Sequence, residues 1–501
     1  MLTKSENNLS FVTSLLLLAS TIAYYIFIQF VSPVLYGVDG YYHIAVARCI
    51  KDFGLKYGFP WAQFSTFTNA FSDKELLFHL LSVPFLYVTD NIILAAKFSV
   101  VFYNLLFFSV FIFILRKYVP YFLIGVSLLF LVASGYFSVR FTCLRPEILA
   151  IILTVLGVYF LIKKNRWGVF IIGVVYSLSH ISFFTLFIFA VCCETVRYIM
   201  KKEVCVPNLY MSFLGILSGS LIHPHNPYNW VSFHLNAILV PFYSMREVAL
   251  DLGPELLSTD SKKIFIENIS LFLCGSGIIG FVLMRTTKLS VDTAVWWACF
   301  MFYFFLGFIG SRYWYPATAL FIVFAASFVY DWTAGRNIRD ITVALRPVVL
   351  AVMIFLGLHA SYTITKMAEH ITFYTFRNDQ YEEAASWMKK NLPAQQTVYH
   401  ANWSVSPYFI ALNPKDNYLV VLDPIYMFYP YPEKYMVYKE LFHGKAKDPY
   451  RAIKDNFGVT YGCVDKNTRL YRQIKGDKDH FLMLHENIRV AVFRLLDNKE
   501  Q

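Results

Sequence analysis

Long apolar runs dominate this sequence and restrict it to folds in which most segments contact lipid. Of its 501 residues, 57% are hydrophobic and only 15% are charged, whereas soluble domains carry about 25% charged residues. A helix needs roughly 20 apolar residues to span a bilayer, and fewer inside a bundle. The sequence predicts about eleven such segments, at 11–31, 91–115, 119–136, 146–163, 168–181, 182–198, 209–222, 266–284, 293–310, 313–331 and 344–362. The predicted fold class is therefore a polytopic α-helical membrane protein.

Basic residues beside the segment ends predict the topology. With a cytoplasmic N-terminus, five short basic clusters fall on the inner side, as the positive-inside rule expects. They are Arg116-Lys117, Lys163-Lys164-Arg166, Arg197 with Lys201-Lys202, Arg285 with Lys288, and Arg336 with Arg339. This arrangement requires that 168–198 be two short helices divided at Ser179-His180. The loops 36–90, 137–145 and 223–265 are then outside. The first segment has no small-residue cleavage site after it, so we expect an uncleaved helix.

The net charge and the cysteines exclude two other classes of protein. A formal charge of +11 would suggest nucleic acid in a soluble protein, but here the inner clusters account for much of it, and no nucleic-acid partner is expected. The eight cysteines show no CxxC or Cys/His spacing. A disulfide framework or a zinc site is therefore not expected.

The composition changes after about residue 372. "DQYEEAASWMKKNL" predicts an amphipathic helix, and "TVYHA", "NYLVVLD" and "VTYGCVD" predict short strands. "PEKYMVYKELFHG" and "DPYRAIKDNFG" predict helices that each end at a glycine. The alternation predicts two domains: a transmembrane domain over 1–365, with a first external loop at 36–90, and a small extracytoplasmic α/β domain over 366–501.

Ionisable residues gather at the predicted outer ends of the membrane segments. The stretch "YGVDGYYHIAVARCI" places Asp39 just after the first segment, and the same loop ends with Asp73, Lys74 and Glu75. Other loops and helix ends on that side contribute Arg140, Arg145, His223, His225 and Arg312. Polar groups at this depth are costly unless they face a cavity or each other. An outward cavity with carboxylates and a basic patch suits an anionic, lipid-linked substrate.

Each of these residues also has a simpler interpretation. Asp39 alone could be a solvated loop acid, and Asp73 to Glu75 could begin an interfacial helix. The arginines could extend to lipid headgroups, and "HPHNPYNW" could be a rigid turn in which Pro224 and Pro227 fix the backbone. Their common location on one side of one bundle favours a joint site.

Two stretches of the first loop resemble the GT-C glycosyltransferases, polytopic enzymes that use sugars carried on polyprenyl phosphate or pyrophosphate. "GVDGYYHIAVARCI" resembles their signature, with Asp39 at the position of the catalytic acid. "SDKELLFHLLSVPF" resembles the acid-Lys-Pro-Pro-Leu stretch of aminoarabinose transferases and of relatives of protein O-mannosyltransferases. Asp73 and Lys74 match its acid and lysine, whereas Glu75-Leu76 replaces the prolines. The C-terminal domain is more similar to the oligosaccharyltransferase catalytic subunit, but no WWD-type motif is present.

The resemblance implies an inverting glycosyltransferase with its active site on the outer face of a bacterial or archaeal plasma membrane. Asp39 would act as the base, and Arg140, Arg145, Arg312, His223, His225 and Lys74 would bind the donor phosphate. A divalent cation, Mg²⁺ or Mn²⁺, is an open alternative, with Asp39, Asp73 and Glu75 as its ligands. The partners would be the polyprenyl-linked donor, membrane lipid, and a glycan, lipid or protein acceptor.

Two other functions also fit a charged helix bundle. A transporter or flippase of a lipid-linked glycan needs a polar cavity, but such carriers usually place acids near mid-membrane in repeated halves. A structural or assembly protein would leave the clustering of Asp39 with the three arginines unexplained. The enzyme hypothesis requires that Asp39 and at least two of these arginines line one cavity.

Overall fold

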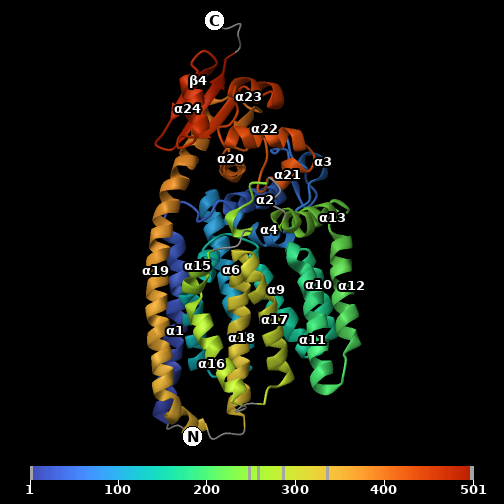
Figure 1. Cartoon of the computed structure of the whole chain (residues 1–501), viewed down its shortest axis with the longest axis vertical. Helices are drawn as coiled ribbons and strands as arrows, with labels where there is room; N and C mark the ends of the chain where they lie inside the picture. Colours follow the sequence, from blue (N-terminus) through green and yellow to red (C-terminus); the bar gives the residue numbers. More distant parts are fainter. Residues whose placement is uncertain (1–3, 246–249, 257–259, 285–287, 335–337, 497–501) are drawn as a thin grey trace.

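The structure is a computed structural model that describes residues 4–245, 250–256, 260–284, 288–334 and 338–496. A bundle of long helices forms one end of the molecule, and a sheet with short helices forms the other (Figure 1). Of the basic clusters predicted on the inner side, Arg285 and Arg336 lie outside these residues, and the side chain of Arg339 is not described either.

Each of the eleven apolar segments contains a helix, and one further short helix, Gly135–Phe141, begins at the end of the third segment. The helices are α1 (Lys4–Phe30), α6 (Ile92–Leu115), α7 (Tyr121–Ala133), α8 (Gly135–Phe141), α9 (Glu147–Ile162), α10 (Arg166–Ser177), α11 (Thr185–Lys201), α12 (Val206–Ile222), α16 (Ile269–Leu283), α17 (Val291–Ile309), α18 (Trp314–Thr333) and α19 (Ile338–Asn391). Among the described residues, five helices are long and apolar enough to span a membrane, or seven if each of two bent helix pairs is one span. The helical membrane fold is thus supported, while the count of eleven spans stays a prediction.

Two breaks interrupt the helices of the bundle. The predicted division at Ser179-His180 is confirmed, because α10 ends at Ser177 and a short 3₁₀ helix, Ile181–Phe184, precedes α11. A second break separates α7 from α8, which meet at 86°. The bend turns α8, the helix that carries Arg140, across the end of the bundle instead of continuing α7.

Glycines hold α10 and α12 in backbone contact. A Cβ added at Gly173 would lie 2.9 Å from the Ile216 nitrogen, and one added at Gly219 would lie 2.6 Å from the Val174 carbonyl oxygen. A Cβ at Gly215 would overlap the Phe170 carbonyl oxygen. Small residues four apart, as Gly215 and Gly219 are, typically allow membrane helices to approach this closely.

We expect Gly215→Ala to lower the thermal stability of the detergent-purified protein, because the two backbones must separate. Overpacking of this kind costs about 1–3 kcal/mol. Gly280→Ala in α16 is the matched control, since its new Cβ would meet no atom within 4 Å. Equal melting temperatures for the two variants would show that α10 and α12 do not depend on the glycine contact.

The helix α19 joins the two ends of the molecule. It runs along the bundle and continues without interruption beside the sheet (Figure 1). The predicted domain boundary at residues 365 and 366 falls inside this helix, so no change of element marks it. A continuous helix is a stiff connection, and it fixes the position of the C-terminal part relative to the bundle.

The C-terminal part contains a five-stranded mixed sheet in the order β2-β1-β3-β5-β4. The strands are β1 (Thr397–His400), β2 (Asn417–Tyr418), β3 (Tyr461–Asp465), β4 (Phe481–Glu486) and β5 (Val490–Leu495), and the helices are α20 (Ser406–Leu412), α21 (Ile425–Phe428), α22 (Pro432–Phe442), α23 (Pro449–Phe457) and α24 (Arg469–Gly476). β1 is parallel to β2 and β3, whereas β5 is antiparallel to both β3 and β4. Two of the predicted strands and both predicted helices that end near a glycine are present, whereas the strand predicted at 417–423 is limited to Asn417–Tyr418 and the sequence did not predict β4 and β5.

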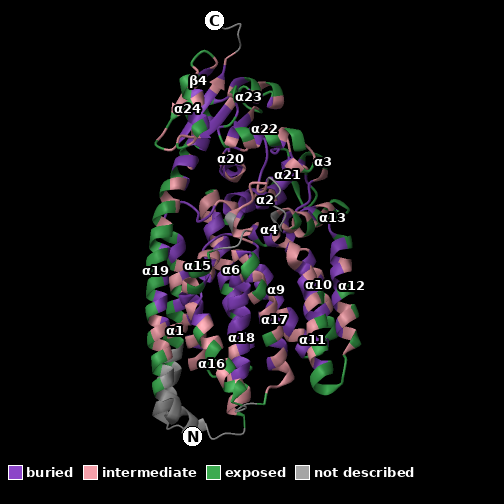
Figure 2. Ribbon diagram, viewed as in Figure 1, coloured by how far each residue is buried: buried purple, intermediate pink, exposed green. Residues whose placement is uncertain are grey.

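The loop 36–90 packs tightly between the bundle and the sheet. It forms α2 (Asp39–Phe53), α3 (Phe67–Ala70), α4 (Leu76–Ser82) and α5 (Phe85–Val88), and much of it is buried (Figure 2). Its segment 61–66 runs beside β2: Tyr418 N–H donates to the Trp61 carbonyl at 2.6 Å, and Gln63 N–H donates to the Tyr418 carbonyl at 2.8 Å. The first loop and the C-terminal sheet therefore form one continuous support for the site.

Candidate functional site

A cavity of about 900 Å³ lies between the bundle and the C-terminal part. Its walls come from the start of α2, from α8, from the loop around residue 255, from α15 (Ser261–Glu267), from α19, and from two loops of the C-terminal part. Their charged members are Asp39, Arg140, Arg145, Glu255, Lys263, Glu267, Lys366, Glu369, Arg377 and Asp423. The cavity is large enough for a drug-sized ligand.

Asp39 is the first residue of α2 and lines this cavity. Its Oδ2 lies 2.5 Å from Nη2 of Arg145, and its side chain keeps 32% of its surface exposed. A carboxylate in the first turn of a helix is also favoured by the partial positive charge of that end. The structure therefore brings together the predicted base and one predicted phosphate-binding arginine, which are far apart in the sequence.

Glu255 forms ion pairs with two arginines of the site. Arg140 forms an ion pair with Glu255 through Nη2, and Nη1 of Arg145 lies 3.2 Å from Glu255 Oε2. Both guanidinium groups also approach Glu147, at 3.6 Å and 3.4 Å. Arg312 stacks on the Tyr313 ring, with 5.8 Å between guanidinium carbon and ring centroid. Burial would raise the pKa of Glu255, but the charges of Arg140 and Arg312 hold it below its ordinary value.

Burial and the neighbouring acids make the carboxylate of Asp39 more basic than that of a solvated aspartate. Burial, together with the negative charges of Glu255 and Glu147, raises the pKa of Asp39 to about 7, and Arg140 and Lys74 oppose this rise. General bases work best when their pKa lies near the operating pH. Asp39 can therefore be ionised at neutral pH and still accept a proton effectively.

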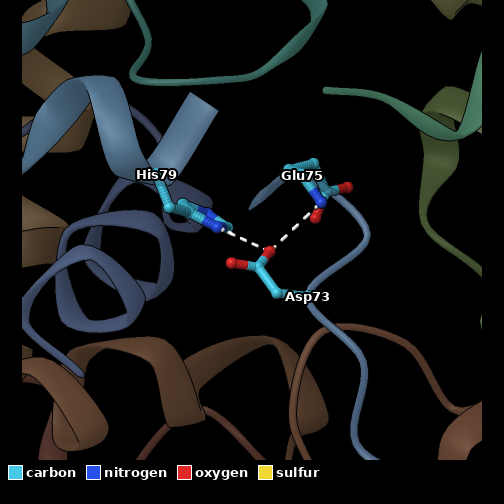
Figure 3. A group of neighbouring side chains, drawn as sticks. All are labelled: Asp73, Glu75 and His79. Carbon is cyan, nitrogen blue, oxygen red and sulfur yellow. Dashed lines mark hydrogen bonds and ion pairs between the residues drawn. The ribbon is translucent and has the colours of Figure 1, made fainter. Parts of the chain in front are cut away.

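A second cluster of polar side chains is centred on Asp73, which is not part of the cavity lining. His79 Nδ1 lies 2.7 Å from Asp73 Oδ1, which also accepts from the backbone N–H of Glu75 at 3.1 Å (Figure 3). Tyr57 donates its hydroxyl to Asp73 Oδ2 at 3.0 Å, and His43 Nδ1 lies 2.8 Å from His79 Nε2. Burial would raise the pKa of Asp73, but its partners, His79 first, keep it below its ordinary value. Asp73 is therefore buried, and both of its carboxylate oxygens have hydrogen-bond partners.

His223, His225 and Lys74 surround this second group, outside the lining of the large cavity. His223 Nε2 lies 2.9 Å from the Asp73 carbonyl oxygen, and Asp73 N–H donates to His225 Nδ1 at 3.4 Å. Lys74 Nζ donates to Asn236 Oδ1 at 3.2 Å and to the Tyr426 hydroxyl at 3.3 Å. The two histidines thus hold the backbone of the loop, and the phosphate-binding role expected for all three residues stays a prediction.

Asp73, Glu75 and His79 are chemically suited to a divalent cation. Each offers one ligand atom, and the three atoms lie within 4.8 Å of one another. Oε2 of Glu75 is buried and has no hydrogen-bond partner among the described residues, and burial raises the pKa of Glu75 to about 7. A mixed oxygen and nitrogen set suits Mn²⁺ better than Mg²⁺, which prefers oxygen ligands and retained waters. The predicted set of Asp39, Asp73 and Glu75 differs, because Asp39 lies with Arg145 in the cavity and His79 takes the third place.

The sequence did not predict Glu255 and Asp423, two acids that line the same cavity as Asp39. Glu255 lies in a stretch without a motif, and Asp423 is the last residue of the predicted strand "NYLVVLD", where nothing indicates a site. No local spacing could have shown that Arg140 and Arg145 share one acid, since Arg140 and Glu255 are 115 positions apart.

Comparisons with solved structures place the fold. The Archaeoglobus fulgidus oligosaccharyltransferase in its apo form aligns with a TM-score of 0.57 and 11% identity, over 89% of this chain and 69% of that one. ArnT from Cupriavidus metallidurans bound to undecaprenyl phosphate aligns with a TM-score of 0.56 and 11% identity, over 99% of both chains. The mycobacterial arabinofuranosyltransferase AftD aligns with a TM-score of 0.55 and 12% identity, over 96% of this chain and 40% of that one.

All three similar proteins are GT-C glycosyltransferases, so this chain has the GT-C fold. At these identities the likeness extends to the fold and not to the substrates. No protein-family model matches the sequence, and no curated protein gives a significant match.

Proposed function

We propose that the protein is an inverting glycosyltransferase that moves a sugar from a polyprenyl-phosphate or polyprenyl-pyrophosphate donor to an acceptor. The observation that carries the proposal is the pairing of Asp39 and Arg145 at 2.5 Å in the wall of a cavity of about 900 Å³. A base and a cation side by side are the two groups that such a transfer needs. ArnT, which has the same fold, was solved with undecaprenyl phosphate bound, which supports a lipid-linked donor.

The proposed reaction is a single displacement. An acceptor hydroxyl attacks the anomeric carbon and transfers its proton to the Asp39 carboxylate, while the bond between that carbon and the phosphate oxygen breaks. The bonding pair leaves with the phosphate, and one displacement inverts the anomeric centre. Arg140 and Arg145 stabilise the charge that develops on the leaving phosphate. Bidentate guanidinium groups suit phosphate oxygens better than ammonium groups do.

Glu255 and a donor phosphate would compete for the same guanidinium groups. Glu255 already contacts both Arg140 and Arg145, so it occupies the place that a phosphate anion would take. Arg312, which lies close enough to lower the pKa of Glu255, would extend this basic wall. A divalent cation held by Asp73, Glu75 and His79 would add positive charge on the side of Lys74.

The cavity should face the outside of the plasma membrane of a bacterium or archaeon. The basic clusters at the opposite ends of the helices support this orientation. We expect a cysteine introduced at position 430, between two tyrosines of the C-terminal part, to react with a membrane-impermeant maleimide in intact cells. A cysteine at position 164, in the loop between α9 and α10, should react only after the membrane is opened. The reverse pattern would place the active site in the cytoplasm.

The proposed activity is tested by mass spectrometry of membrane lipids and envelope glycans from cells with and without the gene. Loss of the gene should remove a sugar from one glycan, glycolipid or glycoprotein and increase the polyprenyl-phosphate sugar that supplies it. A carrier of lipid-linked glycans would instead leave the sugar attached to its lipid on the wrong side. Unchanged pools of both donor and product would contradict the proposal.

A further inference from the structure

The cavity wall contributed by the C-terminal part is built on a strained turn. Leu422 has a φ of +68°, a region that side-chain-bearing residues rarely adopt. The N–H of Asp423 donates to the carbonyl of Val421 at 2.9 Å, which closes a three-residue turn. A γ-turn with positive φ is rare and strained, and strain of this kind tends to persist at functional sites where the surroundings enforce it.

The surroundings of this turn do enforce it. On one side, the backbone N–H groups of Leu419 and Val420 donate to Nε2 of the buried His400 at 3.2 Å and 3.4 Å. On the other side, Phe64 N–H donates to the Leu419 carbonyl at 2.8 Å, and Thr66 N–H donates to the Tyr426 carbonyl at 2.9 Å. The chain is thus fixed before and after the turn by the sheet and by the first loop.

The result of the strain is the position of Asp423. Leu422 and Asp423 both line the large cavity, which Asp39 also lines. Asp423 Oδ1 accepts from the backbone N–H of Ile425 at 3.0 Å, whereas Oδ2 receives no hydrogen bond from any residue that the structure describes. Burial raises the pKa of Asp423 to about 6, although Lys74 and Arg312 oppose the rise. One carboxylate oxygen is therefore held rigidly and the other is available.

Two charged residues, Lys74 and Glu255, act on the pKa of both Asp423 and Asp39. Both of these acids line the cavity. Asp39 is already paired with Arg145, while Asp423 has no ion-pair partner within 4.0 Å among the described residues. The cations near Asp423 make an additional ammonium ligand unfavourable, and a neutral hydroxyl donor is the ligand that its free oxygen suits.

We propose that Asp423 binds a hydroxyl of the acceptor and holds that acceptor with its attacking hydroxyl facing Asp39. The acceptor is then a polyhydroxylated molecule, such as a glycan or the sugar of a glycolipid, and the C-terminal part supplies its binding site. This inference rests on the proposed glycosyl transfer. In this arrangement the arginines hold the donor, Asp39 takes the proton, and Asp423 positions the acceptor.

The test uses the full-length protein reconstituted with a lipid and glycan extract from cells that lack the gene, which contains both substrates. Asp423→Asn removes a charged hydrogen bond, and we expect the apparent KM for the acceptor fraction to rise by about tenfold, with kcat changed much less. Inhibition by undecaprenyl phosphate should be unchanged, since the arginines are intact. Asp455→Asn, on the exposed face of α23, is the control and should behave as the wild type.

Asp423→Glu covers the case in which the asparagine variant does not fold, because it keeps the charge and moves the carboxylate by one methylene. It should also raise the acceptor KM. A wild-type acceptor KM in a folded Asp423 variant would overturn the inference, as would an equal change in undecaprenyl phosphate inhibition. If Asp39→Asn is inactive in the same assay, the proposed function stands even when the inference fails; if Asp39→Asn is fully active, the proposed function itself fails.

Discussion

Asp39→Asn should nearly abolish sugar transfer while leaving the protein folded and inserted. The amide keeps the size of the side chain and one hydrogen bond to Arg145, but it cannot take the proton of the attacking hydroxyl. Loss of a general base typically lowers the rate on the order of 10²–10⁴-fold. The measurement is the initial rate of transfer by the purified variant, with its melting temperature as a check of folding.

Two readouts separate a base from a structural acid at this position. In the wild type, kcat/KM should rise with pH up to about 7, because the raised pKa of Asp39 leaves the carboxyl protonated below that pH. Undecaprenyl phosphate should still inhibit the Asp39→Asn protein. If the variant retains near-wild-type transfer, Asp39 serves only as an ion-pair partner of Arg145, and the base must be sought among the other acids.

Arg145→Gln should lower kcat/KM on the order of 10²-fold, the cost of removing one preorganised donor to a developing oxyanion. One guanidinium contacts three carboxylates, those of Asp39, Glu147 and Glu255. A neutral amide of similar length cannot replace that charge. Unlike Asp39→Asn, this variant should also bind undecaprenyl phosphate more weakly, because the arginine is expected to hold the phosphate. Enzyme assays and inhibitor titration together measure both effects.

Arg145→Lys should fall between the wild type and Arg145→Gln, since lysine keeps the charge but not the planar fork. Arg116→Lys is the matched control, on an exposed arginine at the other end of the bundle that stacks on Tyr121. If Arg145→Gln and Arg116→Lys were equally active, Arg145 would have no part in donor binding. A purely transporting protein would show no cleavage of the sugar–phosphate bond in any of these variants.

The helices of the bundle could be predicted because apolar runs of spanning length carry a strong local signal. The division at Ser179-His180 followed from the charges on either side of it. The sequence also predicted that Asp39, Arg140 and Arg145 lie together, because all three fall at the same ends of the helices. These predictions depend on local patterns combined with a single topology rule.

The rest depends on contacts between distant segments that leave no local pattern. Glu255, in η3 (Pro254–Leu256), pairs with Arg140 and Arg145, which lie more than a hundred positions earlier in the chain. Asp73 binds His79 instead of joining Asp39, and its backbone contacts His223 and His225, which lie some 150 positions later in the chain. The strained turn at Leu422 could not be foreseen either, since leucine is not a residue expected at positive φ.

A structure of the protein determined with undecaprenyl phosphate is the most direct test of the central claim, that this cavity is where a lipid-linked donor reacts. We expect the phosphate to lie within about 3 Å of the guanidinium groups of Arg140 and Arg145, at charge-assisted hydrogen-bond distance. Glu255 should have moved away from both arginines. Asp39 should face the space beside the phosphate that the transferred sugar would occupy. A lipid phosphate bound elsewhere, with the ion pairs of Glu255 intact, would contradict it.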